Sequence, residues 1–274
     1  MKIKILNLAL YLTQRCNLNC AHCLCGNPNN LDITDTVLDK LFSQVDEIFN
    51  LGICGGEISL ATEKFRKVLE YIKKYNVKID TFNITTNATL FSEDLISIVK
   101  DFESYVKQFE YTANDYFAKS IPIQQKVRIS LDHFHVESAK QNNYSIENIL
   151  ANVSKYKNIL GENVVISFDS DYAIINSGRA VNINENIIKK QRIEMSRPCL
   201  IINDAMMIGG IVTVNCLGDL LPINLSYEEE KANSYGNLSD EPLLEIIKKL
   251  NLIDCKTIKE FYDINLKEFR KLEC

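Results

Sequence analysis

Strand-like apolar runs alternate with helix-like patterns over residues 5–168 of this chain. Leucines at every second position from Leu6 to Leu12 predict the first strand. Similar runs at 48–53, 82–84, 127–131 and 164–168 predict four more. Strands separated by crossover helices predict a parallel sheet, either open and doubly wound or curled into a barrel. In both cases an active site is expected at the carboxyl ends of the strands.

The segments between these strands carry helix signals of their own. Thr34, Ser92 and Ser145 are suitable N-cap residues, because a side-chain oxygen can accept a free backbone N–H of the first turn. The apolar stripes at helical spacing are Val37, Leu38, Leu41, Phe42 and Val45; Phe65, Val68, Leu69 and Ile72; Leu95, Ile98, Val99 and Phe102; and Ile146, Ile149, Leu150 and Val153.

The strand–helix rhythm ends near Arg179. We therefore expect an α/β domain over residues 1–185 and a small α+β extension over residues 186–274. Residues 205–223 predict a hairpin that turns at Asn215–Asp219, and residues 242–250 and 256–272 predict helices. The first strand begins close to residue 1, so no leader-binding domain is expected ahead of it.

Composition excludes several classes of function. No apolar run is long enough to cross a bilayer or to act as a signal peptide, which predicts a cytoplasmic protein without a membrane partner. The net charge is -5 and the basic residues are dispersed, so no nucleic-acid partner is expected. Nine cysteines in a reducing compartment favour metal binding, reactivity or core packing over disulfides.

Cys16, Cys20 and Cys23 directly follow the first predicted strand. Three thiolates at this spacing can bind three irons of a 4Fe-4S cluster and leave the fourth iron open to another ligand. The alternatives are a structural zinc site that uses Cys25 as the fourth ligand, or reduced cysteines in a loop. Zinc sites usually pair C-x2-C units across a gap, so the spacing favours the open cluster.

A C-x3-C-x2-C loop after the first strand of such a sheet resembles the radical S-adenosylmethionine superfamily. The resemblance implies a partial (β/α)6 barrel, a 4Fe-4S cluster and bound S-adenosylmethionine. It also implies an enzyme that cleaves S-adenosylmethionine reductively to a 5'-deoxyadenosyl radical, which abstracts a hydrogen atom from a substrate. An external one-electron reductant of the flavodoxin or ferredoxin type is implied as a partner.

The second strand ends in Cys54, Gly55, Gly56 and Glu57, which resemble the GGE element of this family, although Ile58 replaces the usual proline. The resemblance implies that the glycines let the backbone approach the cofactor and that the Glu57 carboxylate binds the methionyl ammonium. A plain Gly-Gly turn beside a solvated glutamate is the alternative.

The third and fourth strands supply further candidate cofactor contacts. Thr86 and Asn87 lie in a segment similar to the family's TNG element, and they would bind the carboxylate or ribose of the cofactor. An Asx turn is the alternative. Ser130 and Asp132 lie two residues apart, which predicts one face of the sheet, and the family often uses this strand end for ribose contacts.

The histidines and one arginine complete the candidate set. His22 occupies a position that is often aromatic in the family and packs near adenine, whereas His133 and His135 are predicted as loop residues facing solvent or substrate. Arg179 lies in a Gly-Arg-Ala segment similar to that of members with an auxiliary C-terminal domain. It is expected to pair with a cofactor or substrate carboxylate, and a helix-capping turn is the alternative.

The C-terminal quarter partly resembles the auxiliary domains called SPASM or twitch. Gly218 fits the glycine of that pattern, but the expected second cysteine is Ile223. Two interpretations of the remaining cysteines stay open: they bind a second cluster, or they are buried free cysteines. These residues are Cys199, Cys216, Cys255 and Cys274. The resemblance implies a peptide substrate, modified by crosslinking or epimerisation, and a small metabolite is the alternative. Cys54 is a candidate hydrogen-atom donor in an epimerisation, with core packing as its alternative role.

Overall fold

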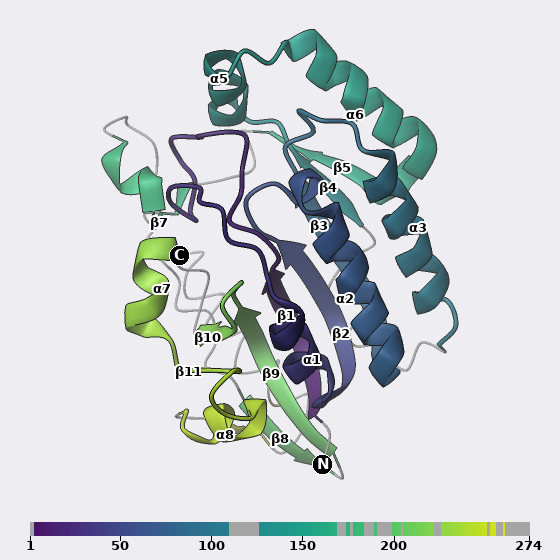
Figure 1. Cartoon of the computed structure of the whole chain (residues 1–274), viewed down its shortest axis with the longest axis vertical. Helices are drawn as coiled ribbons and strands as arrows, with labels where there is room; N and C mark the ends of the chain where they lie inside the picture. The colour runs from purple at the N-terminus through teal and green to yellow at the C-terminus, as the bar shows by residue number, and fades with distance from the viewer. Residues whose placement is uncertain are drawn as a thin grey trace.

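The computed structural model describes residues 3–109, 126–168, 174–175, 178–183, 189–190, 199–203, 205–221, 226–250, 253–255 and 260. A mixed α/β fold is built on one large sheet (Figure 1). Its central strands are β1 (Ile3–Tyr11), β2 (Val45–Cys54), β3 (Lys78–Thr86), β4 (Val127–Ser130) and β5 (Val164–Ser167). They pair in parallel in chain order, which confirms the five predicted strands.

The helices that connect these strands are α1 (Asp35–Phe42), α2 (Thr62–Tyr75), α3 (Glu93–Val106), α5 (His133–Gln141) and α6 (Ile146–Leu160), with short 3-10 turns η1 (Ile58–Leu60) and η2 (Gly161–Asn163). Three of the helices, α1, α3 and α6, begin at the predicted caps. Thr34, Ser92 and Ser145 each accept a backbone N–H three residues on. In the part of the chain that the structure describes, no helix is both long and apolar enough to cross a membrane.

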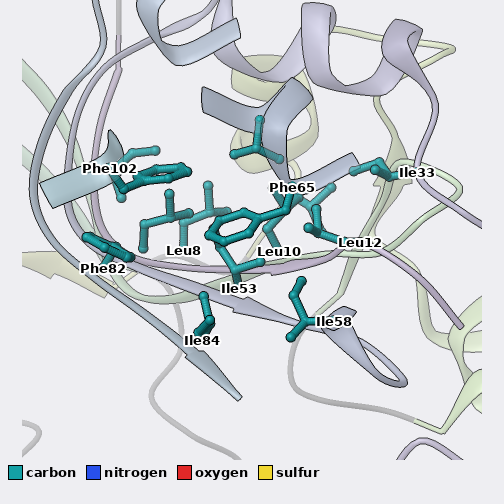
Figure 2. Close-up of a cluster of buried hydrophobic side chains, with 14 of the residues drawn as sticks. Leu8, Leu10, Leu12, Ile33, Ile53, Ile58, Phe65, Phe82, Ile84 and Phe102 are labelled. Atoms are coloured by element: carbon teal, nitrogen blue, oxygen red, sulfur yellow. The ribbon is translucent and has the colours of Figure 1, made fainter. Parts of the chain in front are cut away.

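The core lies between the sheet and its helices. Figure 2 shows Phe65 of α2 and Phe102 of α3 close to strand residues that include Phe82. The Phe102 ring centroid lies 5.1 Å from that of Phe65 and 4.9 Å from that of Phe82. Burying each such ring contributes about 1.5–3 kcal/mol. This packing fixes the strands, and with them the loops at their carboxyl ends.

Three details of the fold differ from the predictions. Val45 is the first residue of β2 rather than part of the α1 stripe, because a buried apolar residue fits either period. Leu150 lies on the exposed side of α6. Helix α5 carries few apolar residues, so its sequence gave no helical stripe, and it begins with His133.

The C-terminal segments join the same sheet. They comprise β8 (Cys199–Asn203), β9 (Ala205–Val214), β10 (Asp219–Leu221), α7 (Tyr227–Asn233), β11 (Gly236–Asn237), α8 (Leu243–Lys248) and β12 (Ile253–Cys255). The predicted hairpin is confirmed, since the Asn215 N–H donates to the Asp219 carbonyl over 3.1 Å. Strand β9 pairs in parallel with β1, on the opposite side from β2.

The sheet is open among the described residues, with β11 and β5 at the two ends of its hydrogen-bonded order. Closure into a barrel is therefore not observed, and β6 (Ile174–Ile175) pairs with β7 (Lys189–Lys190) in a separate sheet instead of extending β5. The division at residue 185 stays a prediction. The helix expected over residues 256–272 lies outside the described residues, apart from residue 260.

Candidate active site

A cavity of about 600 Å³ lies where the sequence predicted an active site, at the carboxyl ends of the parallel strands. Cys54, Thr86, Ser130 and Ser167 are the last residues of β2, β3, β4 and β5, and all four line it. Parallel strands place these ends on one edge of the sheet, so residues far apart in sequence face a common space.

The predicted cysteine loop forms one wall of this cavity. Cys16, Cys20 and Cys23 all line it, and all three are free thiols. The Cys23 N–H donates to the Cys20 carbonyl over 3.1 Å, which turns the loop between these two residues. The Leu18 N–H points at the Cys16 sulfur over 3.5 Å. The structure therefore brings together the three residues predicted to bind a cluster.

The loop thiols differ in acidity. Burial raises the pKa of Cys16 to about 11 and that of Cys20 to about 12. The Cys25 side chain hydrogen-bonds Cys23 and, with the charge of Arg179, lowers the Cys23 pKa to about 6. Metal binds the thiolate form, so binding at Cys16 and Cys20 must release protons.

Glu57 is buried, in contrast to the solvated carboxylate of a plain turn. Its Oε1 accepts hydrogen bonds from the Thr86 hydroxyl over 2.6 Å and from the Ser59 N–H over 3.0 Å. Its Oε2 accepts the Asn87 N–H over 2.8 Å. The carboxylate therefore joins the turn after β2 to the turn after β3. A contact with a methionyl ammonium stays a prediction.

Gly55 and Gly56 were predicted to let the backbone approach the cofactor, but the structure shows them packed against the backbone of Thr13 and Arg15. Gly55 has φ +153, and a Cβ atom there would overlap the Thr13 carbonyl oxygen. A Cβ atom at Gly56 would overlap the carbonyl oxygen of Arg15. The Gly56 N–H donates to the Thr13 carbonyl over 2.7 Å. The glycines thus let the turn pack on the backbone that leads into Cys16.

The side chains of Thr86 and Asn87 also bond within the protein, although both residues line the cavity. Asn87 Nδ2 donates to Asn17 Oδ1 over 3.1 Å, and Asn87 Oδ1 accepts the Thr89 hydroxyl over 2.6 Å. Asn17 in turn donates to Thr89 and to the Tyr144 hydroxyl over 2.7 and 2.8 Å. Asn17 was missed in the sequence, because only its place between two cysteines singles it out.

Asp132 lies just beyond β4, where it caps α5 by accepting the His135 N–H over 3.0 Å. The Asp132 Oδ2 atom lies 2.6 Å from His135 Nδ1 and 3.5 Å from His22 Nε2. Burial would raise the Asp132 pKa, but these hydrogen bonds outweigh burial and hold it well below its usual range. His22 stacks on Phe134 with ring centroids 4.6 Å apart.

Two consequences follow from this arrangement. His133 and His135 belong to the first turn of α5, which corrects their prediction as loop residues, and both line the cavity. One ligand atom from each of His22, Asp132 and His135 lies within 4.8 Å of the others. Two imidazoles and a carboxylate form a donor set that divalent transition metals accept, but the same contacts are ordinary hydrogen bonds.

Arg179 lies in η4 (Gly178–Asn182) and lines the cavity. Its guanidinium bonds the cysteine loop, whereas a pairing with a carboxylate was expected. Nε donates to the Cys20 carbonyl over 2.9 Å, and Nη1 donates to Asn19 Oδ1. The Arg179 backbone N–H donates to the Cys23 carbonyl over 3.0 Å.

Cys54 lines the cavity, and burial raises its pKa to about 12, so the thiol keeps its hydrogen at neutral pH. Its role as a hydrogen-atom donor stays a prediction. Sequence reasoning missed Tyr227 at the start of α7, which also lines the cavity and whose N–H donates to the Cys25 carbonyl over 2.9 Å. No local pattern marks this residue, because its place depends on the packing of α7.

Of the C-terminal cysteines that the structure describes, Cys199 lies in β8, Cys216 follows β9 and Cys255 lies in β12. Cys216 is buried after β9, and its thiol donates to the Tyr11 carbonyl over 3.3 Å. Leu200, next to Cys199, pairs with Ile208, eight residues before Cys216. Ile208 lies six residues before Val214, the last residue of β9, which is roughly 20 Å at about 3.3 Å per residue and argues against one four-thiolate site containing both cysteines. Cys255 of β12 pairs with Ile201 of β8. Cys274 and Ile223 lie outside the described residues.

Comparison with known proteins gives distant similarities. No protein-family model matches the chain. Over 102 residues it is 31% identical to the uncharacterized protein MJ0907 of Methanocaldococcus jannaschii, and the match covers 35% of each chain. It is 25% identical over 217 residues to the uncharacterized protein MJ0804 of the same organism, covering 72% of this chain and 68% of that one. The match thus spans about a third of the first relative.

Among solved structures, anSMEcpe with bound AdoMet is 17% identical, with a TM-score of 0.45 and coverage of 95% of this chain and 82% of that one. SuiB of Streptococcus suis bound to its precursor peptide SuiA is 15% identical, with a TM-score of 0.42 and coverage of 88% and 64%. SuiB bound to S-adenosylmethionine has a TM-score of 0.40, at 16% identity and coverage of 88% and 63%. These values describe a distant likeness.

Proposed function

We propose that this chain is a radical S-adenosylmethionine enzyme whose 4Fe-4S cluster is bound by Cys16, Cys20 and Cys23. One observation carries the proposal: the three thiols of a single loop line the same cavity as the GGE-like and TNG-like turns. Three protein ligands are one fewer than a cubane has irons, so one iron remains for the cofactor. The soluble one-electron reductant that this chemistry needs is available in the cytoplasm, where we propose that the protein works.

The residues present fit both groups. The thiols are free and face the cavity, and its volume of about 600 Å³ lies in the range of cofactor pockets. When bound, the cluster would supply the electron that cleaves S-adenosylmethionine to methionine and a 5'-deoxyadenosyl radical, which takes a hydrogen atom from the substrate. The protein would leave one iron without a protein ligand, orient the cofactor and the substrate, and exclude water from the cavity.

The chain's own groups divide this work. Glu57 holds the turns after β2 and β3 together and thereby shapes the part of the cavity wall that these turns form. Ser130 and Asp132 line the cavity, and we assign them to hydrogen bonds with the ribose. The stacked rings of His22 and Phe134 offer a flat surface suited to adenine.

We propose a peptide as the substrate, modified by crosslinking or epimerisation. Support comes from the β9–β10 hairpin, which carries the SPASM-like or twitch-like pattern around Gly218. A small metabolite is the alternative. A precursor peptide encoded nearby would favour a peptide over a metabolite. Mass spectrometry of the modified peptide would then separate the two reactions, because crosslinking removes two hydrogens and epimerisation in deuterated water adds deuterium at one α-carbon.

The central experiment uses anaerobically reconstituted protein, reduced with dithionite and supplied with S-adenosylmethionine. We expect 5'-deoxyadenosine by liquid chromatography and mass spectrometry, and none from Cys20→Ala. Cys216→Ala is the matched control, because Cys216 is buried in the turn after β9 and is not among the residues that line the cavity. Product from Cys20→Ala, or none from a fully loaded wild type, would overturn the proposal.

A second candidate is a non-catalytic zinc or iron-sulfur protein in which Cys25 closes the site. The observation in its favour is that Cys25 lines the cavity and its side chain bonds Cys23. Metal analysis separates the two functions. One zinc without sulfide, lost in Cys25→Ala, supports the closed site, whereas four irons retained in Cys25→Ala and perturbed by S-adenosylmethionine support the enzyme.

A further inference from the structure

The segment that holds Arg179 lies against the cysteine loop, although 159 positions separate Arg179 from Cys20. Arg179 makes three hydrogen bonds to the loop: from its backbone N–H to the Cys23 carbonyl, from Nε to the Cys20 carbonyl, and from Nη1 to Asn19. Two of these acceptors are the backbone carbonyls of cluster ligands. The contact therefore constrains the peptide groups that set where those two thiols point.

Gly178 makes this approach sterically possible. Its φ is +57, a conformation that favours glycine. A Cβ atom there would overlap the carbonyl oxygens of Cys23 and Leu24. The obstacle is backbone, which cannot swing aside as a flexible side chain can. The Gly-Arg pair thus works as a unit, in which the glycine allows contact and the arginine makes the bonds.

Other contacts hold the loop at different points. The Asn19 N–H donates to Ser138 over 2.7 Å, and the Cys25 carbonyl accepts from Tyr227. Between these two points, Arg179 donates to the backbone carbonyls of Cys20 and Cys23, and the Ser138 side chain hydrogen-bonds the Cys20 thiol. Arg179 also brings a permanent positive charge close to Cys16 and Cys23, where three thiolates would concentrate negative charge.

We propose that Arg179 is a positioning residue that presets the cysteine loop for cluster binding and stabilises the negative charge of the bound cluster. The inference rests on the proposed function. A loop that is already ordered loses less conformational entropy when it binds metal. A fixed cation beside a cluster raises its reduction potential, because reduction adds negative charge.

The first test needs no cluster and no activity. Cys20 is buried, so in protein prepared without iron its rate of alkylation by iodoacetamide, followed by peptide mass spectrometry, reports opening of the loop. We expect several-fold faster alkylation of Cys20 in Arg179→Gln, and an intermediate rate in Arg179→Lys, which keeps the charge but loses the forked geometry. The matched control is Arg66→Gln, which changes a half-exposed arginine on α2 whose ion pair is with Asp101.

Equal Cys20 alkylation in Arg179→Gln, Arg66→Gln and wild type would overturn the positioning role. If Arg179→Gln fails to fold, as judged by circular dichroism, Asn19→Ala replaces it, because that change removes one side-chain acceptor of Arg179. The same direction of change in the alkylation of Cys20 is expected there, at smaller size. An unchanged rate in a folded Asn19→Ala would equally count against the role.

The second test uses the reconstituted protein. We expect Arg179→Gln to lose iron to a chelator several-fold faster and to show a more negative cluster potential by redox titration. Arg179→Lys should lose iron faster but keep a potential close to wild type, and this split separates geometry from charge. Equal potentials in all three would overturn the electrostatic part. Failure of the wild type to cleave S-adenosylmethionine would instead count against the proposed function and leave the alkylation result standing.

Discussion

The Glu57 carboxylate accepts a 2.6 Å hydrogen bond from the Thr86 hydroxyl, and this bond joins the turns that follow β2 and β3. Both residues are buried, so neither finds a ready replacement in water. The contact explains why a glutamate and a threonine from separate motifs are needed together. Their bond shapes one wall of the cavity before any cofactor binds.

Thr86→Val is expected to lower the free energy of unfolding by about 1–3 kcal/mol, because it removes a donor from a buried carboxylate without changing side-chain shape much. Urea denaturation measures the change. Thr86→Ser keeps the hydroxyl and should recover most of the loss. Equal stability of the valine and wild-type proteins would show that the bond contributes nothing.

Gly56→Ala should destabilise the turn after β2, since the added methyl would overlap the Arg15 carbonyl oxygen beside Cys16. Overpacking of this kind costs about 1–3 kcal/mol. Gly52→Ala, within β2, is the control, because its Cβ would meet no atom closer than 3.6 Å. Thermal unfolding and iron content should fall together in the first variant. Similar values for the two variants would contradict the steric argument.

Asp132→Asn should keep helix α5, since asparagine caps helices about as well as aspartate. It removes the anionic partner of His22 and His135. We expect unchanged circular dichroism and a several-fold weaker affinity for S-adenosylmethionine by anaerobic calorimetry. Asp101→Asn, on the exposed face of α3, is the control. Equal affinities in both variants would remove Asp132 from the cofactor site.

Glu230 links stability to pH. It is buried on α7, where burial raises its pKa to about 7, although Asn215 donates to it over 2.8 Å. The folded state therefore holds a proton that the unfolded state releases near pH 4.5, so this group's contribution to stability falls as pH rises from 4.5 through 7.

Glu230→Gln should flatten that fall, which we expect to be about 1–2 kcal/mol after allowing for screening by water. Urea titrations at several pH values in this window measure it. Glu162→Gln, on the exposed η2 turn, serves as the comparison. A fall of the same size in Glu230→Gln and wild type would assign the pH dependence to other groups.

The strands, the capped helices and the cysteine loop could be predicted because each depends on residues close together in the chain. Alternating leucines indicate β1, and Thr34 indicates the start of α1, without knowledge of any distant segment. Helix α5 was missed for the complementary reason: its few apolar residues produce little periodicity, and Asp132 supplies the cap that starts it.

By itself, the sequence determined the parallel α/β sheet and the placement of Cys16, Cys20 and Cys23 at the carboxyl end of its first strand. Only the tertiary structure decided that Arg179 bonds the cysteine loop and that β9 pairs with β1. The physical reason is the distance along the chain over which each kind of interaction acts. Periodicity and caps act over a few residues, whereas these pairings depend on how distant segments pack, which no local pattern encodes.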